Sequence, residues 1–174
     1  MRKITAYEIA LSALACAIST IILVVGVYSD ILLFTGYLLA TVALMLPLAK
    51  QSYRGYALAY VGTSLLSLLL NPARIFDLLP FICFFGLHPL INELQLKSKI
   101  NKWVACALKA LWFDITMYLV WFFLFDATLD IPIDPKYILP LIFVLGSAFF
   151  VFYDYAMYKW RYAVNMLVKR IKKK

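Results

Sequence analysis

The chain has 174 residues, of which 65% are hydrophobic, and its formal net charge is +8. A water-soluble domain of this size could not hide so much apolar surface, so the composition excludes a soluble globular protein and indicates an integral membrane protein. The basic residues gather at the ends of apolar runs, which favours anionic lipid over nucleic acid as their partner.

The apolar runs predict an all-α protein, a bundle of six transmembrane helices. A bilayer core about 30 Å thick needs about 20 helical residues, and an open sheet would leave backbone groups unpaired in hydrocarbon. The connections carry the expected breaks, Asn71-Pro72 and a segment with two prolines and three aspartates at 126–135. We expect a single transmembrane domain over residues 1–174, without a second soluble domain. The predicted spans cover residues 9–28, 31–49, 56–70, 75–94, 103–125 and 137–158.

The basic residues of the connections predict that both the N-terminus and the C-terminus are cytoplasmic. With the N-terminus inside, fourteen lysines and arginines fall on the inner side and two, Arg74 and Lys136, on the outer side. Short cytoplasmic connections are rich in lysine and arginine, so this asymmetry favours an even number of spans. Residues 159–174 form a basic amphipathic tail, with Trp160, Ala163, Val164, Leu167 and Ile171 at helical spacing. The tail is either a topological anchor or a surface that contacts the inner leaflet or a partner.

The first predicted span carries four alanines on one helix face. Ala6, Ala10, Ala13 and Ala17 follow one another at spacings of four, three and four residues. Small side chains let another helix approach closely, which is how apolar helices associate in lipid. This face is therefore predicted either to pack inside the bundle or to dock a partner protein.

Polar residues inside the predicted spans are the candidates for function. A charge near the bilayer centre costs about 2.5–3.5 kcal/mol and usually faces the bundle interior. Asp114 falls near the middle of the fifth span, where a functional and a structural role are both open. A second set in the cytoplasmic half is predicted to hold three helices together, with Lys109 paired to either Asp154 or Glu93. This structural polar cluster comprises His88, Asn92, Glu93, Lys109 and Asp154.

Residues at the outer ends of the spans would meet a solute first. Arg74 could bind an anionic group of that solute, or it could pair with Asp77. The candidate solute-binding residues are Tyr37, Asn71, Arg74, Asp114, Tyr118 and Trp121.

Motifs for catalysis, metal binding and nucleotide binding are missing. The chain has one histidine, and its three cysteines lie in apolar runs without the spacing of metal ligands. No HExxH, GxSxG or phosphate-binding glycine loop occurs. We therefore expect no enzyme activity, no metal and no cofactor. A membrane enzyme built on Asp114, His88 and Asp154 is disfavoured, because Asp114 is expected far from the other two.

A small, basic six-span protein with an alanine-rich first helix resembles the substrate-binding (S) components of bacterial energy-coupling factor (ECF) transporters. In that family an AxxxA-type motif docks the first helix onto a transmembrane coupling (T) component. The matching segments here are A6-x-x-x-A10 and A13-x-x-x-A17. The resemblance implies a plasma-membrane protein that binds a vitamin or similar micronutrient near its outer face. It also implies a T subunit with two cytoplasmic ATPases as partners.

The chain is also similar to a group of six-span proteins from Gram-positive bacteria. Asn92 and Asp114 stand where lysine and asparagine are expected in that group. The segments that carry this second resemblance are F84-F85-G86-L87-H88-P89, K109-A110-L111-W112-F113-D114 and F152-Y153-D154-Y155.

A different functional class is a non-catalytic scaffold in cell-envelope assembly, similar in form to six-span rod-shape membrane proteins. A scaffold predicts a closed outer face and a partner surface elsewhere. A transport subunit predicts an outward-facing pocket lined by the candidate solute-binding residues.

Overall fold

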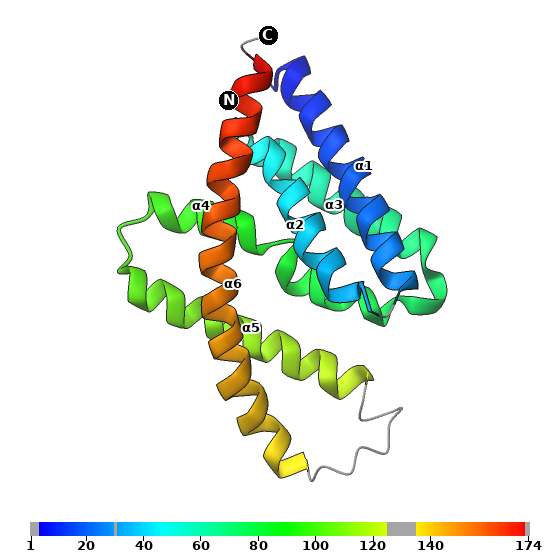
Figure 1. Ribbon diagram of the computed structural model, residues 1–174, viewed down its shortest axis with the longest axis vertical. Helices are drawn as coiled ribbons and strands as arrows, with labels where there is room; N and C mark the ends of the chain where they lie inside the picture. The colour runs from blue at the N-terminus through cyan, green and yellow to red at the C-terminus, as the bar shows by residue number, and fades with distance from the viewer. Residues whose placement is uncertain (1–3, 30, 125–134, 173–174) are drawn as a thin grey trace.

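The computed structural model describes residues 4–29, 31–124 and 135–172, and every regular element in these ranges is helical (Figure 1). The prediction of an all-α protein is therefore confirmed, while most of the predicted connection at 126–135 lies outside the described residues. Between α3 and α4 the chain forms two 3₁₀ turns, Pro72–Arg74 and Phe76–Leu78, and a π-helical turn, Phe81–Phe85. The α-helices are α1 (Ala6–Tyr28), α2 (Leu33–Leu48), α3 (Tyr53–Leu70), α4 (His88–Lys97), α5 (Lys102–Leu124) and α6 (Pro135–Lys172).

Four helical segments in the described part of the chain are long and apolar enough to cross a membrane. They are Ala6–Tyr28, Phe76–Lys97, Lys102–Phe122 and Leu139–Ile171, which correspond to the first, fourth, fifth and sixth predicted spans. The apolar helix α2 is shorter, with 16 residues. The structure is thus that of a protein with several long apolar helices, compatible with a membrane location.

The last predicted span, which was expected to run on into the amphipathic tail, does so. The helix α6 continues through the basic tail to Lys172 and contains 38 residues. At about 1.5 Å per residue it is about 57 Å long, roughly twice the thickness of a bilayer core. The tail is therefore an extension of the same rigid helix and not a separate element.

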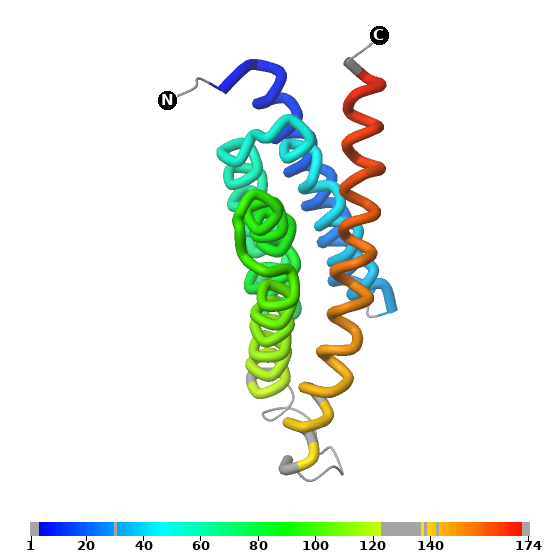
Figure 2. Tube along the Cα trace, turned by 90° about the vertical axis from the view of Figure 1, so that its left-hand side faces the viewer, coloured from blue at the N-terminus to red at the C-terminus, as the bar shows by residue number. Residues whose placement is uncertain are grey.

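The helix α2 lies at the centre of the fold, where it contacts α1, α3, α4 and α6. In Figure 1, α1, α2 and α3 form one group, and α5 crosses α6 on the other side of the molecule. The start of α1 and the end of α6 lie at the same end of the molecule in both views (Figure 2). The N-terminal end of α1 and the C-terminal end of α6 therefore lie on the same side of the bundle.

Small residues bring α1 and α2 together. A Cβ atom added to Gly26 would lie 3.2 Å from the Cα atom of Gly36, and one added to Gly36 would lie 3.2 Å from the Cα atom of Gly26. Backbone atoms, which cannot rotate away, occupy this space. Farther along the same contact, the Ser19 hydroxyl donates a hydrogen bond of 2.9 Å to the carbonyl oxygen of Ala40. Close backbone approach through small residues is the usual way in which helices associate in lipid.

The predicted fourth span, residues 75–94, is not one continuous α-helix. In the π-helical turn the Gly86 N–H donates to the Phe81 carbonyl at 2.7 Å, five residues back, so neighbouring carbonyl groups lose their α-helical partners. Hydroxyl groups of α2 and α3 replace those partners, which is the condition for irregular backbone inside a membrane protein. The hydroxyl of Tyr60 donates to the Ile82 carbonyl (2.6 Å), and that of Tyr56 donates to the Gly86 carbonyl. The Thr41 hydroxyl lies 2.7 Å from the Tyr37 carbonyl and 3.1 Å from that of Phe85, which lacks a helical donor because residue 89 is proline.

Candidate functional site

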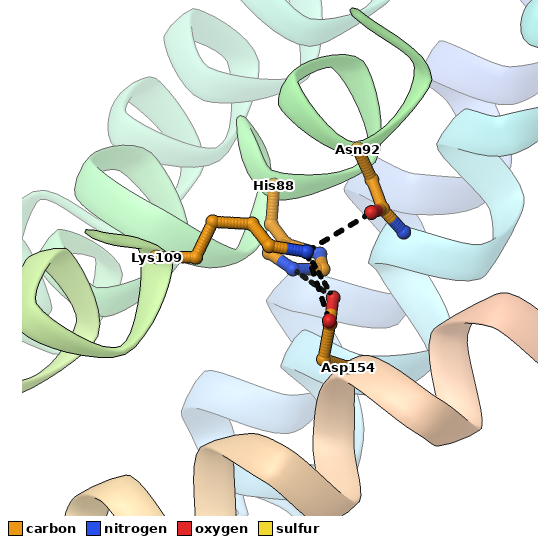
Figure 3. Close-up of polar contacts among 4 residues, drawn as sticks. All are labelled: His88, Asn92, Lys109 and Asp154. Atoms are coloured by element: carbon orange, nitrogen blue, oxygen red, sulfur yellow. Dashed lines mark hydrogen bonds and ion pairs between the residues drawn. The ribbon is translucent and has the colours of Figure 1, made fainter. Parts of the chain in front are cut away.

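Four polar side chains from α4, α5 and α6 form a network in the interior (Figure 3). The ammonium group of Lys109 donates to both carboxylate oxygens of Asp154, at 2.7 and 2.8 Å. It also donates to Oδ1 of Asn92 at 3.1 Å. Nε2 of His88 lies 3.0 Å from Oδ1 of Asp154. Four of the five residues predicted as a structural polar cluster are therefore in direct contact.

The network is almost completely shielded from solvent. The exposed fraction is 0% for His88, 5% for Lys109 and 8% for Asn92, and Asp154 is half-buried. Removing one charge from water without a partner is costly, whereas a paired and hydrogen-bonded charge can remain inside. The ammonium and carboxylate charges cancel here, so the network suits the clamping of three helices together.

Aromatic rings surround the buried imidazole of His88. The ring centroids of Tyr153, Phe84 and Phe150 lie 4.8, 5.4 and 5.9 Å from that of His88. The ammonium group of Lys109 lies 5.9 Å from the centroid of the Phe150 ring, within the range of a cation–π contact. Phe84 belongs to the π-helical turn, which comes shortly before α4, and its ring is one of those around His88. The rings therefore pack directly beside the charged groups.

Glu93, the fifth residue of the predicted cluster, belongs to a second ion pair. Nε and Nη2 of Arg161 donate to its two carboxylate oxygens, the latter at 2.9 Å. Of the two pairings predicted for Lys109, the structure shows the one with Asp154. Sequence analysis placed Arg161 in the tail and did not connect it with Glu93. Its position seven residues after Asp154, on the same side of a continuous helix, is the signal that could have revealed the pair.

A narrow cleft lies beside the Glu93–Arg161 ion pair and Asn92. Its volume is about 10 Å³, which is enough for about one water molecule. A vitamin-sized ligand needs a pocket of about 300–1,000 Å³. Within the described residues, no three histidine, cysteine, aspartate or glutamate side chains are grouped to hold a metal ion. The residues that line the cleft are Met45, Leu48, Pro89, Asn92, Glu93, Met157, Arg161 and Asn165.

Three of the candidate solute-binding residues bind the chain itself at the turn after α3. The Tyr37 hydroxyl donates to the carbonyl oxygen of Asp77, and Nη1 of Arg74 donates to the carbonyl oxygen of Val27. Arg74 also pairs with the Asp77 carboxylate, at 3.1 Å, so the structure shows this predicted alternative. Nδ2 of Asn71 donates to the carbonyl group four residues earlier, at 2.7 Å. These contacts hold the irregular segment against α1 and α2.

The other three candidate solute-binding residues lie on α5. Asp114 is 1% exposed and its Oδ2 accepts a hydrogen bond of 2.6 Å from the hydroxyl of Ser147, while its Oδ1 has no hydrogen-bond partner among the described residues. Tyr118 and Trp121 contact each other, with ring centroids 6.0 Å apart. Ser147 precedes Asp154 by two helical turns, about 10 Å along α6, so Asp114 is separate from the clamping network.

One face of α6 supplies all of these polar partners. Ser147, Asp154 and Arg161 follow one another at intervals of seven residues, which is close to two helical turns. They bind Asp114, Lys109 and Glu93 respectively. We call these three contacts the α6 polar row.

The four alanines of the predicted docking face are all exposed. Ala6, Ala10, Ala13 and Ala17 point outward, while the opposite face of α1, which includes Ala15, is buried. In the structure these alanines do not pack against the other described helices. A groove of about 240 Å³ lies beside them, between α1 and α3. Its lining residues are small or apolar: Ile4, Ile9, Ser12, Ala13, Cys16, Gly55, Leu58 and Ala59.

No protein-family model, curated protein or solved structure matches this chain.

Proposed function

We propose that this protein is a non-catalytic subunit of a bacterial membrane complex and that it binds its partner through the alanine face of α1. The exposure of Ala6, Ala10, Ala13 and Ala17 carries the proposal. A helix that faces only lipid gains nothing from a row of small side chains, whereas a helix that packs against another helix needs them. The groove between α1 and α3 extends this surface, so that a partner helix could contact both.

The proposed topology has six spans with both termini in the cytoplasm. The start of α1 and the end of α6 share one end of the molecule, as an even number of crossings requires. The inner side would then carry the basic connection between α4 and α5 and the basic end of α6, in agreement with the usual distribution of lysine and arginine.

The substrate-binding component of an ECF transporter is the first form that this subunit could take. The alanine face would dock onto the T subunit, and ATP hydrolysis by the cytoplasmic ATPases would reorient the bundle to release a vitamin-like solute. The two AxxxA segments on the exposed face support this form. Solute binding would require a rearrangement, because Tyr37, Asn71 and Arg74 contact the chain itself.

A scaffold in cell-envelope assembly is the second form, and those same contacts favour it. A scaffold needs a partner surface but no pocket for a solute. The polar side chains at the turn after α3 are engaged within the bundle, and aromatic rings pack beside the polar network. The two forms share the alanine face and differ in the partner and in the presence of a solute.

Co-purification with substituted proteins tests the docking face. Ala10→Trp and Ala13→Trp add bulk on the face, and Leu119→Trp adds the same bulk to an exposed position of α5 as the matched control. Each protein would be purified from native membranes in mild detergent, and the retained proteins would be identified by mass spectrometry. We expect the partner to be retained by wild type and Leu119→Trp and lost from both alanine variants.

The identity of the retained partner separates the two forms. A T subunit with ATPases, together with a bound small molecule, supports the transport subunit. Envelope-assembly proteins without a bound small molecule support the scaffold. If the alanine variants retain the same partners as wild type, the docking role of α1 is wrong.

A further inference from the structure

A second groove lies between α4 and α5, on the side of the molecule away from α1. The α4–α5 connection forms the left side of Figure 1 and the front of Figure 2. The groove has a volume of about 260 Å³, and mainly apolar atoms line it. Its apolar side chains include the exposed Leu94, Ile100 and Leu108. In a bilayer such a surface contacts hydrocarbon. The lining residues are Ile91, Leu94, Gln95, Ser98, Ile100, Ala105, Leu108 and Lys109.

The end of this groove is strongly basic. Lys97, Lys99 and Lys102 occur within six residues, and all three are exposed. Lys99 stands between Ser98 and Ile100, both of which line the groove. Lys102 is the first residue of α5, where the helix dipole adds a partial positive charge. An anion beside Ser98 and Ile100 would therefore lie close, along the chain, to two exposed lysines and a helix N-terminus.

No carboxylate of the surrounding sequence compensates this charge. Residues 94–113 contain no aspartate or glutamate. The nearest acidic residue before them, Glu93, binds Arg161 instead. The exposed Trp103 follows Lys102 directly, and tryptophan is enriched at the level of lipid headgroups. An apolar groove, exposed lysines without a nearby acidic residue in the sequence and an exposed indole thus occur together, and these features match the acyl chain, the phosphate and the interface of a lipid.

We propose that the α4–α5 groove binds one anionic glycerophospholipid. An acyl chain lies along Leu94 and Leu108, and the headgroup phosphate contacts Lys99 and Lys102. A zwitterionic lipid would use the same apolar surface without the net charge attraction. This site is distinct from the alanine face of α1 and does not depend on the proposed docking function.

Native mass spectrometry of the full-length protein in nonionic detergent measures this preference directly. The added probes are phosphatidylglycerol, phosphatidylcholine and inorganic phosphate. We expect wild type to retain one phosphatidylglycerol in preference to phosphatidylcholine, and inorganic phosphate not to compete. Equal retention of both lipids, or displacement of the lipid by inorganic phosphate alone, would overturn the proposal.

Two sets of variants assign the preference to the groove and to its lysines. Lys99→Glu with Lys102→Glu should reduce the preference by about 30-fold or more, because each lysine near an anionic surface contributes roughly a factor of five. The double variant Arg54→Glu with Lys159→Glu changes two exposed charges elsewhere and should keep the preference. Leu108→Trp should reduce retention of both lipids, and Val144→Trp, at an exposed position of α6, should not. If each variant retains the lipids as its control does, the groove and its lysines are not the binding site. If a variant fails to fold, the comparison of phosphatidylglycerol with phosphatidylcholine on the wild-type protein still decides the proposal.

Discussion

One ammonium group, that of Lys109 on α5, donates to both carboxylate oxygens of Asp154 on α6, at 2.7 and 2.8 Å. Asn92 and His88 of α4 bind the same pair from the other side. This contact joins α4, α5 and α6, and both of its donors, Lys109 and His88, are buried. The contribution of this ion pair to the free energy of unfolding can be measured.

Removing either member of this pair alone should destabilise the bundle strongly. Lys109→Met leaves an uncompensated carboxylate and Asp154→Leu leaves an uncompensated ammonium, each at a cost of about 3–5 kcal/mol. The double variant should lose less than the sum, because it leaves neither charge inside. Reversible unfolding in mixed micelles would give the free energy of unfolding for all four proteins. Additive losses would show that the two charges do not interact.

The hydroxyl groups that satisfy the π-helical turn should each contribute to stability. Tyr60→Phe removes the donor to the Ile82 carbonyl and should lower the free energy of unfolding by about 1–3 kcal/mol, the cost of an unpaired buried polar group. Tyr155→Phe, which removes a hydroxyl from an exposed tyrosine of α6, is the matched control and should change little. Equal effects of the two substitutions would show that the turn does not depend on this donor.

Adding a side chain at Gly36, where α1 and α2 approach closely, should push the two helices apart. Gly36→Val places Cβ near the Cα atom of Gly26, so backbone must shift, at a cost of about 1–3 kcal/mol. Ile21→Val, at an exposed position of α1, should be neutral. A cysteine pair spanning the α1–α2 contact would report the separation through a reduced rate of cross-linking. Unchanged cross-linking and stability in Gly36→Val would contradict the tight contact.

Reporter fusions test the six-span topology. A fluorescent protein that folds only in the cytoplasm, fused to either terminus, should fluoresce. An alkaline phosphatase inserted within residues 126–134 should be active, because that segment is predicted to be outside. Fluorescence at one terminus only would require an odd number of crossings and would remove the six-span arrangement.

Much of the fold followed from apolar runs, because a run of about 20 residues in lipid must be helical. The start of α1 at Ala6 depends on a local signal that the runs do not show. Thr5 and Glu8 form a reciprocal capping box, with the Thr5 N–H donating to the Glu8 carboxylate at 2.8 Å. The π-helical turn was not predictable either, since the hydroxyl groups that stabilise it come from α2 and α3.

The candidate site was predicted in part for the same reason. Matching depths of Lys109 and Asp154 indicated a contact, because buried charges in a membrane must find partners. Depth alone could not decide whether polar groups at the outer end converge on a solute or bind the nearest backbone carbonyl. The side chains of Tyr37 and Arg74 do the latter, and only the path of the irregular segment after α3 brings those carbonyls within reach.

The α6 polar row fixes the rotation of α6 about its own axis as well as its position along that axis. Ser147, Asp154 and Arg161 lie on one face of the helix and contact three different residues. If α6 shifted by one residue relative to α4 and α5, each of the three side chains would be rotated by about 100°, and all three contacts would be lost together. Positions of α6 between two such registers would lack all three contacts, so α6 should move in discrete steps. A displacement of its basic end would thus also shift Ser147, 14 residues before Arg161, and with it the hydrogen bond that Ser147 donates to Asp114.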